Sequence, residues 1–292
     1  MWNQALAGVR KHLLTYSAPS HFTVLAERPD GLTKNLSPKM DHLVCFMPGT
    51  IALGATGGLT EAGARKSSSW GKKQEEEMRL ARELTKTCWG MYKVMATGLA
   101  PEISCFNVHD PPKMEADGVK ASAEMSNAED AEWKSDYIIK PMDSHNLQRP
   151  ETVESLFYMW RITGDNIYRE WGWEMFKSFI RYSAVENGTG FTSLSNANQL
   201  PPIPKDNMES FWLVSARDLV YERDVCKHSL TCARPKPSST STFYSLPMIY
   251  YLWIRLSSIL KRTYSHALSL VSSSPLAGSG SRETQKDILS RK

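Results

Sequence analysis

The stretch Arg149-Pro150-Glu151-Thr152-Val153-Glu154-Ser155-Leu156-Phe157-Tyr158 decides how this chain is interpreted. Proline is tolerated in the first turn of a helix, where its missing N–H group has no partner to lose. Glu151 and Glu154 then lie one turn apart on the same face. An apolar stripe predicts that a second face packs on a core, and it consists of Val153, Leu156, Phe157 and Trp160. The pattern favours a helix that presents an arginine and two carboxylates at its start.

This acidic pair has two interpretations. Carboxylates in the first turn of a helix are favoured by the helix dipole alone, so the pair has a purely structural explanation. The alternative is that Arg149, Glu151 and Glu154 bind a polyhydroxylated ligand. A guanidinium group offers a rigid fork of donors that suits hydroxyls and carboxylates alike. Spacing by itself leaves both interpretations open.

Length and composition limit the number of domains and the class of protein. A chain of 292 residues forms one large domain or two ordinary ones. Its hydrophobic fraction of 41% and charged fraction of 23% are those of a globular protein. A formal net charge of +4 gives no reason to expect a nucleic-acid partner. We expect no signal peptide at the N-terminus, and no transmembrane segment, because the best candidate at 246–256 is short and contains Arg255.

Hydrophobic periodicity predicts a mostly helical fold. Helices are expected over 2–14, 75–94, 152–162 and 167–182, and the last two form an αα-hairpin around Gly164-Asp165. A short β-prone run at 21–26 ends in a turn, and the polar stretch 110–132 predicts a surface loop. Asp206 and Glu209 predict a capping box at a helix start. Beyond Ala233 we expect a linker, and from Ser272 a disordered tail.

Five blocks in the same order resemble one known family. They are Lys39-Met40-Asp41-His42-Leu43-Val44-Cys45-Phe46-Met47-Pro48-Gly49-Thr50, Thr97-Gly98-Leu99-Ala100-Pro101-Glu102-Ile103, Asn146-Leu147-Gln148-Arg149-Pro150-Glu151-Thr152-Val153-Glu154-Ser155-Leu156-Phe157, Thr163-Gly164-Asp165 with Trp171-Gly172-Trp173, and Asp206-Asn207-Met208-Glu209-Ser210-Phe211. Together they resemble the family 47 glycoside hydrolases, the class I α-1,2-mannosidases. The resemblance covers about 1–213, so we expect a partial catalytic domain there and a non-family segment at 214–292.

The resemblance implies a fold and an activity. It implies part of an (α/α)7 barrel of paired helices, with short β-hairpins between them. It also implies the inverting hydrolysis of terminal α-1,2-linked mannose from a high-mannose N-glycan, with calcium as the cofactor. Such enzymes act on glycoproteins in the secretory pathway, in the endoplasmic reticulum or at Golgi membranes.

The resemblance also assigns roles to individual residues. Glycoside hydrolysis needs two carboxyl groups that flank the scissile bond, and the matched positions imply that Glu102 and Glu151 are catalytic. The matched substrate-binding positions are Asp41, His42, Arg149, Glu154, Glu209 and Phe211. Each has a structural alternative: Glu102 as a helix-start residue after proline, Asp41-His42 as a turn, Glu209 as a capping acid and Phe211 as a core ring.

The positions of the five cysteines do not by themselves determine whether they form disulfides. None of the five cysteines has the paired spacing of a zinc site, so from the residues alone they are buried or free thiols. The resemblance implies instead that Cys45 and Cys88 form a disulfide. A disulfide would place folding in an oxidising compartment.

The sequence departs from the family after Leu213. Ser215 stands where the family carries another glutamate, and no Phe-Asn-Thr-Glu-Ala-His segment is found. That segment supplies the threonine that binds calcium, so we predict no metal-ligating residue and an incomplete calcium site. The half of the barrel that precedes the matched region in the family also has no counterpart. We therefore expect a mannosidase of impaired activity, and the alternatives are a non-catalytic glycan-binding or quality-control protein and an inactive fragment.

Overall fold

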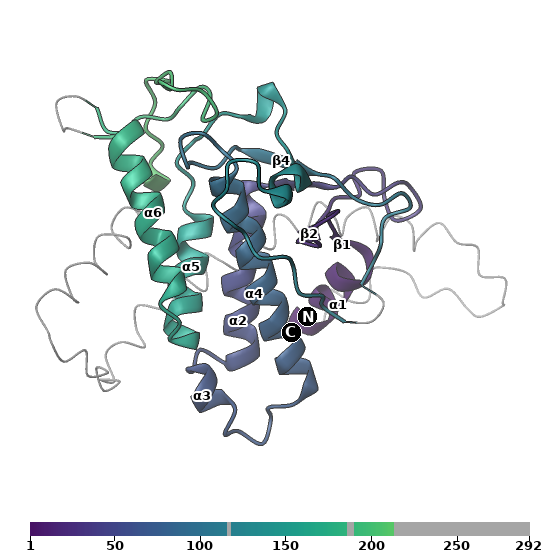
Figure 1. Cartoon of the computed structure of the whole chain (residues 1–292). Coiled ribbons are helices and arrows are strands. Elements are labelled where there is room, and N and C mark those ends of the chain that lie inside the picture. Colours follow the sequence, from purple (N-terminus) through teal and green to yellow (C-terminus); the bar gives the residue numbers. More distant parts are fainter. Residues whose placement is uncertain (116–117, 186–189, 213–292) are drawn as a thin grey trace, which may run out of the picture. The chain divides into compact units, whose positions relative to one another are not determined.

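The computed structural model describes residues 1–115, 118–185 and 190–212; the predicted family boundary at Leu213, the linker and the tail lie outside these residues. The helices are α1 (Trp2–His12), α2 (Met47–Thr56), α3 (Glu61–Ala64), α4 (Lys72–Lys93), α5 (Glu151–Thr163) and α6 (Ile167–Tyr182). Three 3-10 helices are η1 (His42–Phe46), η2 (Glu132–Asp136) and η3 (Pro141–Asp143). The strands are β1 (Leu14–Tyr16), β2 (Thr23–Leu25), β3 (Lys39–Asp41), β4 (Ile103–Phe106) and β5 (Tyr137–Ile138). The predicted mostly helical fold with short strands is confirmed (Figure 1).

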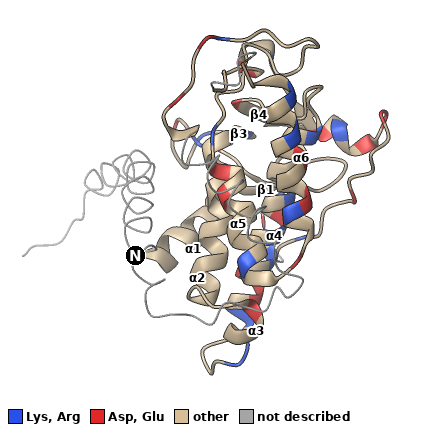
Figure 2. Cartoon of the chain, turned by 90° about the vertical axis from the view of Figure 1, so that its left-hand side faces the viewer, with Lys and Arg blue, Asp and Glu red and all other residues tan. Residues whose placement is uncertain are grey.

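The long helices form the centre of the described structure. Helix α2 packs against both α4 and α5, and α5 packs against α6 (Figure 1). Helix α2 carries no charged side chain, whereas α4 carries both signs of charge (Figure 2). Gly49 allows the close approach of α2 to α5, because a Cβ atom there would lie 3.1 Å from the Tyr158 ring and 3.2 Å from Ser155. The arrangement agrees with stacked pairs of helices, and closure into a barrel stays a prediction.

Two small antiparallel sheets connect the helices. Strands β1 and β2 form a hairpin in which Leu14 pairs with Leu25. Strand β4 lies between β3 and β5, and the register pairs Asp41 with Ile103. The backbone N–H of His42 donates to the carbonyl of Glu102 at 2.9 Å. The second sheet therefore fixes the start of η1 beside the segment that carries Glu102.

The predicted core face of α5 is confirmed in part. Val153 and Leu156 are buried, together with Met159 and Ile162. Trp160 is partly buried and packs against the core, and Phe157 is only partly buried. Trp160 has the guanidinium groups of Arg161 and Arg169 at 5.5 and 5.1 Å from its ring. Trp160 therefore packs against the core and also contacts two cations through its ring. Helical spacing alone does not predict these cation–π contacts.

The predicted capping box of Asp206 and Glu209 is wrong. Asp206 has a φ of 49°, in the left-handed region, and the helical conformation begins only at Phe211. Glu209 accepts a hydrogen bond from the side-chain amide of Asn207 at 3.1 Å. Because the helix starts four residues later than predicted, the two residues cannot satisfy its first N–H groups in the way that a capping box does.

One apolar run bears on the prediction of no transmembrane segment. Residues His42–Ala64 are long and apolar enough to cross a membrane by length and composition, a test that a buried core helix also passes. The run comprises η1, α2 and α3, and α2 buries Ile51, Ala52 and Ala55 against its neighbours. In the described residues, α2 packs on α4 and α5, which favours the interpretation of this part of the run as a core helix.

Gly90 on α4 is required by close packing. A Cβ atom at this position would lie 2.0 Å from the hydroxyl of Tyr137 and 2.5 Å from its Cζ atom. We expect Gly90→Ala to displace Tyr137 and break its hydrogen bond to the Thr87 carbonyl, at a cost of about 1–3 kcal/mol of unfolding free energy. Gly8→Ala on α1 is the matched control, because no atom lies within 4 Å of a Cβ there. Thermal unfolding should show a lower Tm for Gly90→Ala alone; equal values for the two variants would refute this packing argument.

Candidate active site

Glu151 is a buried carboxylate at the start of a helix. It is the first residue of α5, after Pro150 at the N-cap, and it is 6% exposed. A buried charge is costly unless it is paired and hydrogen-bonded. The partners of Glu151 therefore determine what it can do.

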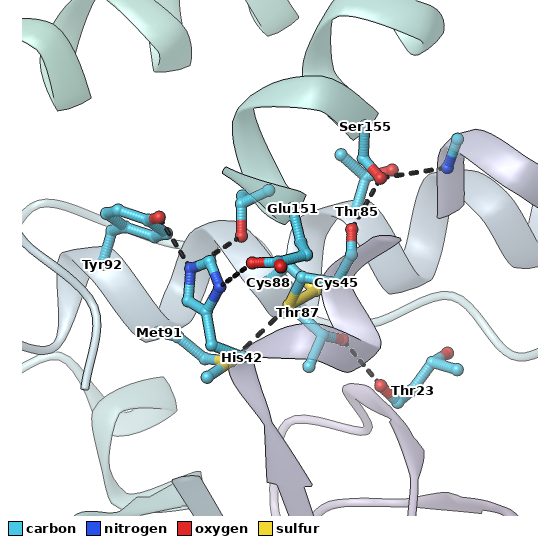
Figure 3. Close-up of a disulfide and its surroundings, with 12 residues drawn as sticks. Thr23, His42, Cys45, Thr85, Thr87, Cys88, Met91, Tyr92, Glu151 and Ser155 are labelled. Atoms are coloured by element: carbon cyan, nitrogen blue, oxygen red, sulfur yellow. Dashed lines mark hydrogen bonds and ion pairs between the residues drawn. A yellow bond between two sulfur atoms is a disulfide. The ribbon is translucent and has the colours of Figure 1, made fainter. Parts of the chain in front are cut away.

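His42 provides the main partner of Glu151. Its Nδ1 atom lies 3.0 Å from Oε2 of Glu151, and its Nε2 atom lies 2.8 Å from the hydroxyl of Tyr92 (Figure 3). Thr152 Oγ1 lies 3.3 Å from the same Nε2 atom. These side chains come from η1, α4 and α5, so three elements that are distant in the sequence converge on one imidazole ring.

The surroundings of Glu151 favour its ionised form. Burial on its own raises the pKa of this carboxyl group, but the interactions with His42, the hydrogen bond from its own backbone N–H and the charge of Arg149 outweigh burial. The net pKa of Glu151 is lower than its ordinary value. A carboxylate that stays ionised suits the role of a base rather than that of an acid.

Glu102 provides a second carboxylate, which is more exposed than that of Glu151. Glu102 forms an ion pair with Arg149, and their side chains are 14% and 20% exposed. The guanidinium of Arg149 also lies over the ring of Phe211, at 5.4 Å from its centre. His42 connects the two carboxylate residues, because its backbone N–H donates to the carbonyl of Glu102 at 2.9 Å and its Nδ1 atom lies 3.0 Å from Glu151. We call His42, Tyr92, Glu102, Arg149 and Glu151 the Glu151 cluster.

The structure thus brings together several of the predicted site residues. His42, Glu102, Arg149 and Glu151 form direct contacts, and Phe211 lies against Arg149. Glu154 follows one turn after Glu151 and is partly buried. The predicted roles of these residues toward a sugar stay predictions.

Asp41 and Glu209 have other partners. Asp41 pairs with Lys39 at 3.2 Å, and Lys39 also pairs with Glu27. Although Asp41 precedes His42 directly, it ends strand β3 while His42 begins η1, so the two side chains meet different neighbours. Glu209 is held by Asn207. Their substrate-binding roles stay predictions that these contacts do not support.

The predicted disulfide between Cys45 and Cys88 is present, with sulfur atoms 2.09 Å apart. It joins η1 to α4 next to the Glu151 cluster, and Met91 lies against it with its sulfur 3.8 Å from that of Cys45 (Figure 3). Ser155 of α5 donates to the Cys45 carbonyl at 2.6 Å and accepts from the N–H of Gly49 at 3.1 Å. The covalent bond and these hydrogen bonds fix η1, α2, α4 and α5 relative to one another.

Sequence analysis did not identify Tyr92 and Thr152 as site residues. A signal was present in the spacing. His42 precedes Cys45 by three residues and Tyr92 follows Cys88 by four, so each lies about one turn from its cysteine. The disulfide between Cys45 and Cys88 therefore brings the turn of η1 that carries His42 next to the turn of α4 that carries Tyr92.

The described residues contain no group of three or more His, Cys, Asp or Glu side chains that is arranged to hold a metal ion. Calcium takes six to eight oxygen ligands, and these include backbone and amide carbonyls. The calcium expected from the family resemblance therefore stays a prediction, and no chemical step is assigned to this ion.

Comparison with known proteins identifies relatives over most of the chain. Residues 1–217 match the sequence pattern of glycosyl hydrolase family 47. A mannosyl-oligosaccharide 1,2-alpha-mannosidase of Arabidopsis thaliana is 46% identical over 221 residues, which are 76% of this chain and 34% of the relative. An endoplasmic reticulum mannosyl-oligosaccharide 1,2-alpha-mannosidase of Schizosaccharomyces pombe is 44% identical over 215 residues, 73% of this chain and 37% of the relative.

A solved structure shares the fold. The alpha-1,2-mannosidase from Trichoderma reesei aligns with a TM-score of 0.56 at 22% identity, over 75% of this chain and 40% of that one. The curated relatives are matched over a minor part of their length, for example 39% of the Saccharomyces cerevisiae protein and 25% of the human protein.

Proposed function

Because the chain belongs to glycosyl hydrolase family 47, we propose that the Glu151 cluster binds the terminal α-1,2-linked mannose of a high-mannose N-glycan and contributes the base for its hydrolysis. The observation that carries the proposal is the contact of His42 with Glu151, because it holds a buried carboxylate in its ionised form. The mannosidase names of the relatives supply the substrate class.

The geometry suggests how a sugar meets these residues. Arg149, Glu102 and Phe211 are the more exposed members of the site, so they contact an incoming pyranose first. The guanidinium of Arg149 lies 5.4 Å from the centre of the Phe211 ring, so a sugar that contacts Arg149 also meets this aromatic side chain. Glu151 lies behind them and accepts the proton of the attacking water in an inverting reaction. Glu102 is the second carboxyl group, and it must leave its ion pair with Arg149 before it can donate a proton.

We further propose that turnover by this chain is slow. Catalysis by inversion requires a carboxylic acid as well as a base, and here the second carboxyl group, Glu102, is held in an ion pair with Arg149. The disulfide and the names of the endoplasmic reticulum relatives support folding and action in the secretory pathway, at the endoplasmic reticulum or Golgi.

Incubation with a high-mannose N-glycan tests the function. Free mannose of the β-anomer, identified by NMR immediately after release, is the result expected for inversion of an α-linkage. A glycan with only α-1,3-linked terminal mannose is the control and should release none. Binding of the glycan without release would favour the non-catalytic glycan-binding alternative. A folded chain that neither binds nor cleaves would refute both.

Calcium remains a proposed cofactor, bound weakly by this chain. With a Kd of about 1 mM, calcium at 1 mM would add about 0.4 kcal/mol of unfolding free energy, because stabilisation follows RT ln(1 + [L]/Kd). We therefore expect 1 mM calcium to raise the Tm of a chelator-treated sample by less than about 2 °C, with magnesium as the control. A rise of 5 °C or more with calcium alone would show a complete site and contradict weak binding.

A further inference from the structure

We propose that Tyr92, acting through His42, is a positioning residue that orients Glu151 as the base. The inference rests on the function proposed above. Tyr92 is 1% exposed and lies on the side of His42 opposite to Glu151 (Figure 3). It therefore acts on the carboxylate through the imidazole and has no direct access to a substrate.

The hydrogen-bond roles follow from the chemistry of the three groups. An ionised carboxylate only accepts, so Nδ1 of His42 must carry the proton that it donates to Glu151. In the neutral imidazole Nε2 is then an acceptor, and its nearest partner is the hydroxyl of Tyr92 at 2.8 Å. Tyr92 donates to Nε2 and thereby selects the form of His42 that donates to Glu151.

Tyr92 is well suited to remain a donor. Burial raises the pKa of its phenol far above the ordinary value, and the charges of Glu151 and Glu102 add to this, while a hydrogen bond with Thr152 acts in the opposite direction. The hydroxyl therefore keeps its proton at neutral pH. Its ring meets the His42 ring edge-on, with centres 5.7 Å apart, and stacks on Trp89.

Thr152 alone does not replace this donor. Its hydroxyl lies 3.3 Å from Nε2, which is longer than the contact with Tyr92, and a hydroxyl can donate or accept. Without Tyr92, the His42 proton can therefore move to Nε2 and point to Thr152. Nδ1 would then be an acceptor facing the Glu151 carboxylate, and two acceptors cannot form a hydrogen bond.

The other charges around Glu151 limit how far the loss of the Tyr92 hydroxyl can raise the pKa of Glu151. Arg149, from the turn before α5, also lowers the pKa of Glu151, and it remains in place when Tyr92 is changed. Glu102, which pairs with Arg149, remains as well. Loss of the Tyr92 hydroxyl is thus expected to raise the pKa of Glu151 toward its ordinary value without abolishing ionisation at neutral pH.

Tyr92→Phe and Tyr137→Phe form a matched pair of variants. Tyr137 is also buried, at 6% exposure, but its hydroxyl donates to the Thr87 carbonyl at 3.0 Å instead of to His42. Each change removes one buried hydrogen bond, so each should lower the unfolding free energy by about 1 kcal/mol. Because phenylalanine keeps the packed ring, we expect both variants to fold.

The first readout is NMR and needs no turnover. The ¹³C titration of the Glu151 carboxyl group should give a higher pKa in Tyr92→Phe than in the parent, and an unchanged pKa in Tyr137→Phe. The ¹⁵N spectrum of His42 at pH 7.5 should show the proton on Nδ1 in the parent and a mixture in Tyr92→Phe. A parent with the proton on Nε2, or identical Glu151 titrations in all three proteins, would overturn the proposal.

The second readout is the pH profile of mannose release. We expect Tyr92→Phe to lower kcat about 10-fold with KM within twofold, and to move the acid limb of the kcat profile to higher pH, since Glu151 protonates earlier. Tyr137→Phe should match the parent. If the parent cleaves and both variants behave alike, the role of Tyr92 is refuted while the hydrolase function stands. If the parent does not cleave, the hydrolase function fails, and the NMR comparison still decides whether Tyr92 orients His42.

Discussion

Replacing Glu151 with glutamine is expected to lower the rate of mannose release at least about 100-fold, because an amide cannot take the proton of the attacking water. The neutral side chain has nearly the same shape, and its Oε1 atom can still accept from Nδ1 of His42. Arg149, Glu102 and Phe211 are unchanged, so KM and glycan affinity should change by less than about threefold. The measurement is kcat and KM with a high-mannose N-glycan.

Glu170→Gln is the matched control for this variant. Glu170 lies in the first turn of α6 and is exposed, so the same chemical change there should leave kcat unaltered. Thermal unfolding of both variants checks that neither has lost its fold. Retention of more than a tenth of the parent kcat in Glu151→Gln would show that another group accepts the proton.

The main helices could be predicted from the sequence because their apolar residues recur at helical spacing. The bounds of α6 match the prediction, and those of α4 and α5 differ by one to three residues. Helix α2 gives no such pattern, because the sequence Met47–Thr56 has no polar face to contrast with an apolar one. Its environment between α4 and α5 is set by tertiary packing, which spacing does not encode.

The site was partly predictable for a similar reason. Motif positions identified His42, Glu102, Arg149 and Glu151, and the structure places them in contact. Tyr92 was missed because its importance depends on which turn of α4 faces η1. A sequence motif names residues within one segment, whereas the choice of the His42 tautomer depends on contacts between segments.

Replacing both Cys45 and Cys88 with alanine is expected to lower the unfolding free energy by about 4 kcal/mol. The cysteines are 43 residues apart, and loop-closure entropy predicts a value of this size for a crosslink of that length. For a domain of about 200 residues this corresponds to a fall in Tm on the order of 10 °C. Activity should fall as well, because η1 carries both Cys45 and His42 and loses its covalent link to α4.

Cys105→Ala is the control for the disulfide variant, because Cys105 is the free cysteine of the described residues and is partly exposed on β4. It should change the unfolding free energy by less than about 1 kcal/mol. Reduction with dithiothreitol in mild denaturant should lower the Tm of the parent to that of the double variant and leave the double variant unaffected. If the parent and the double variant unfold within 2 °C of each other, the crosslink does not stabilise the fold. Placement of His42 beside Tyr92 and Glu151 would then depend on packing and hydrogen bonds alone.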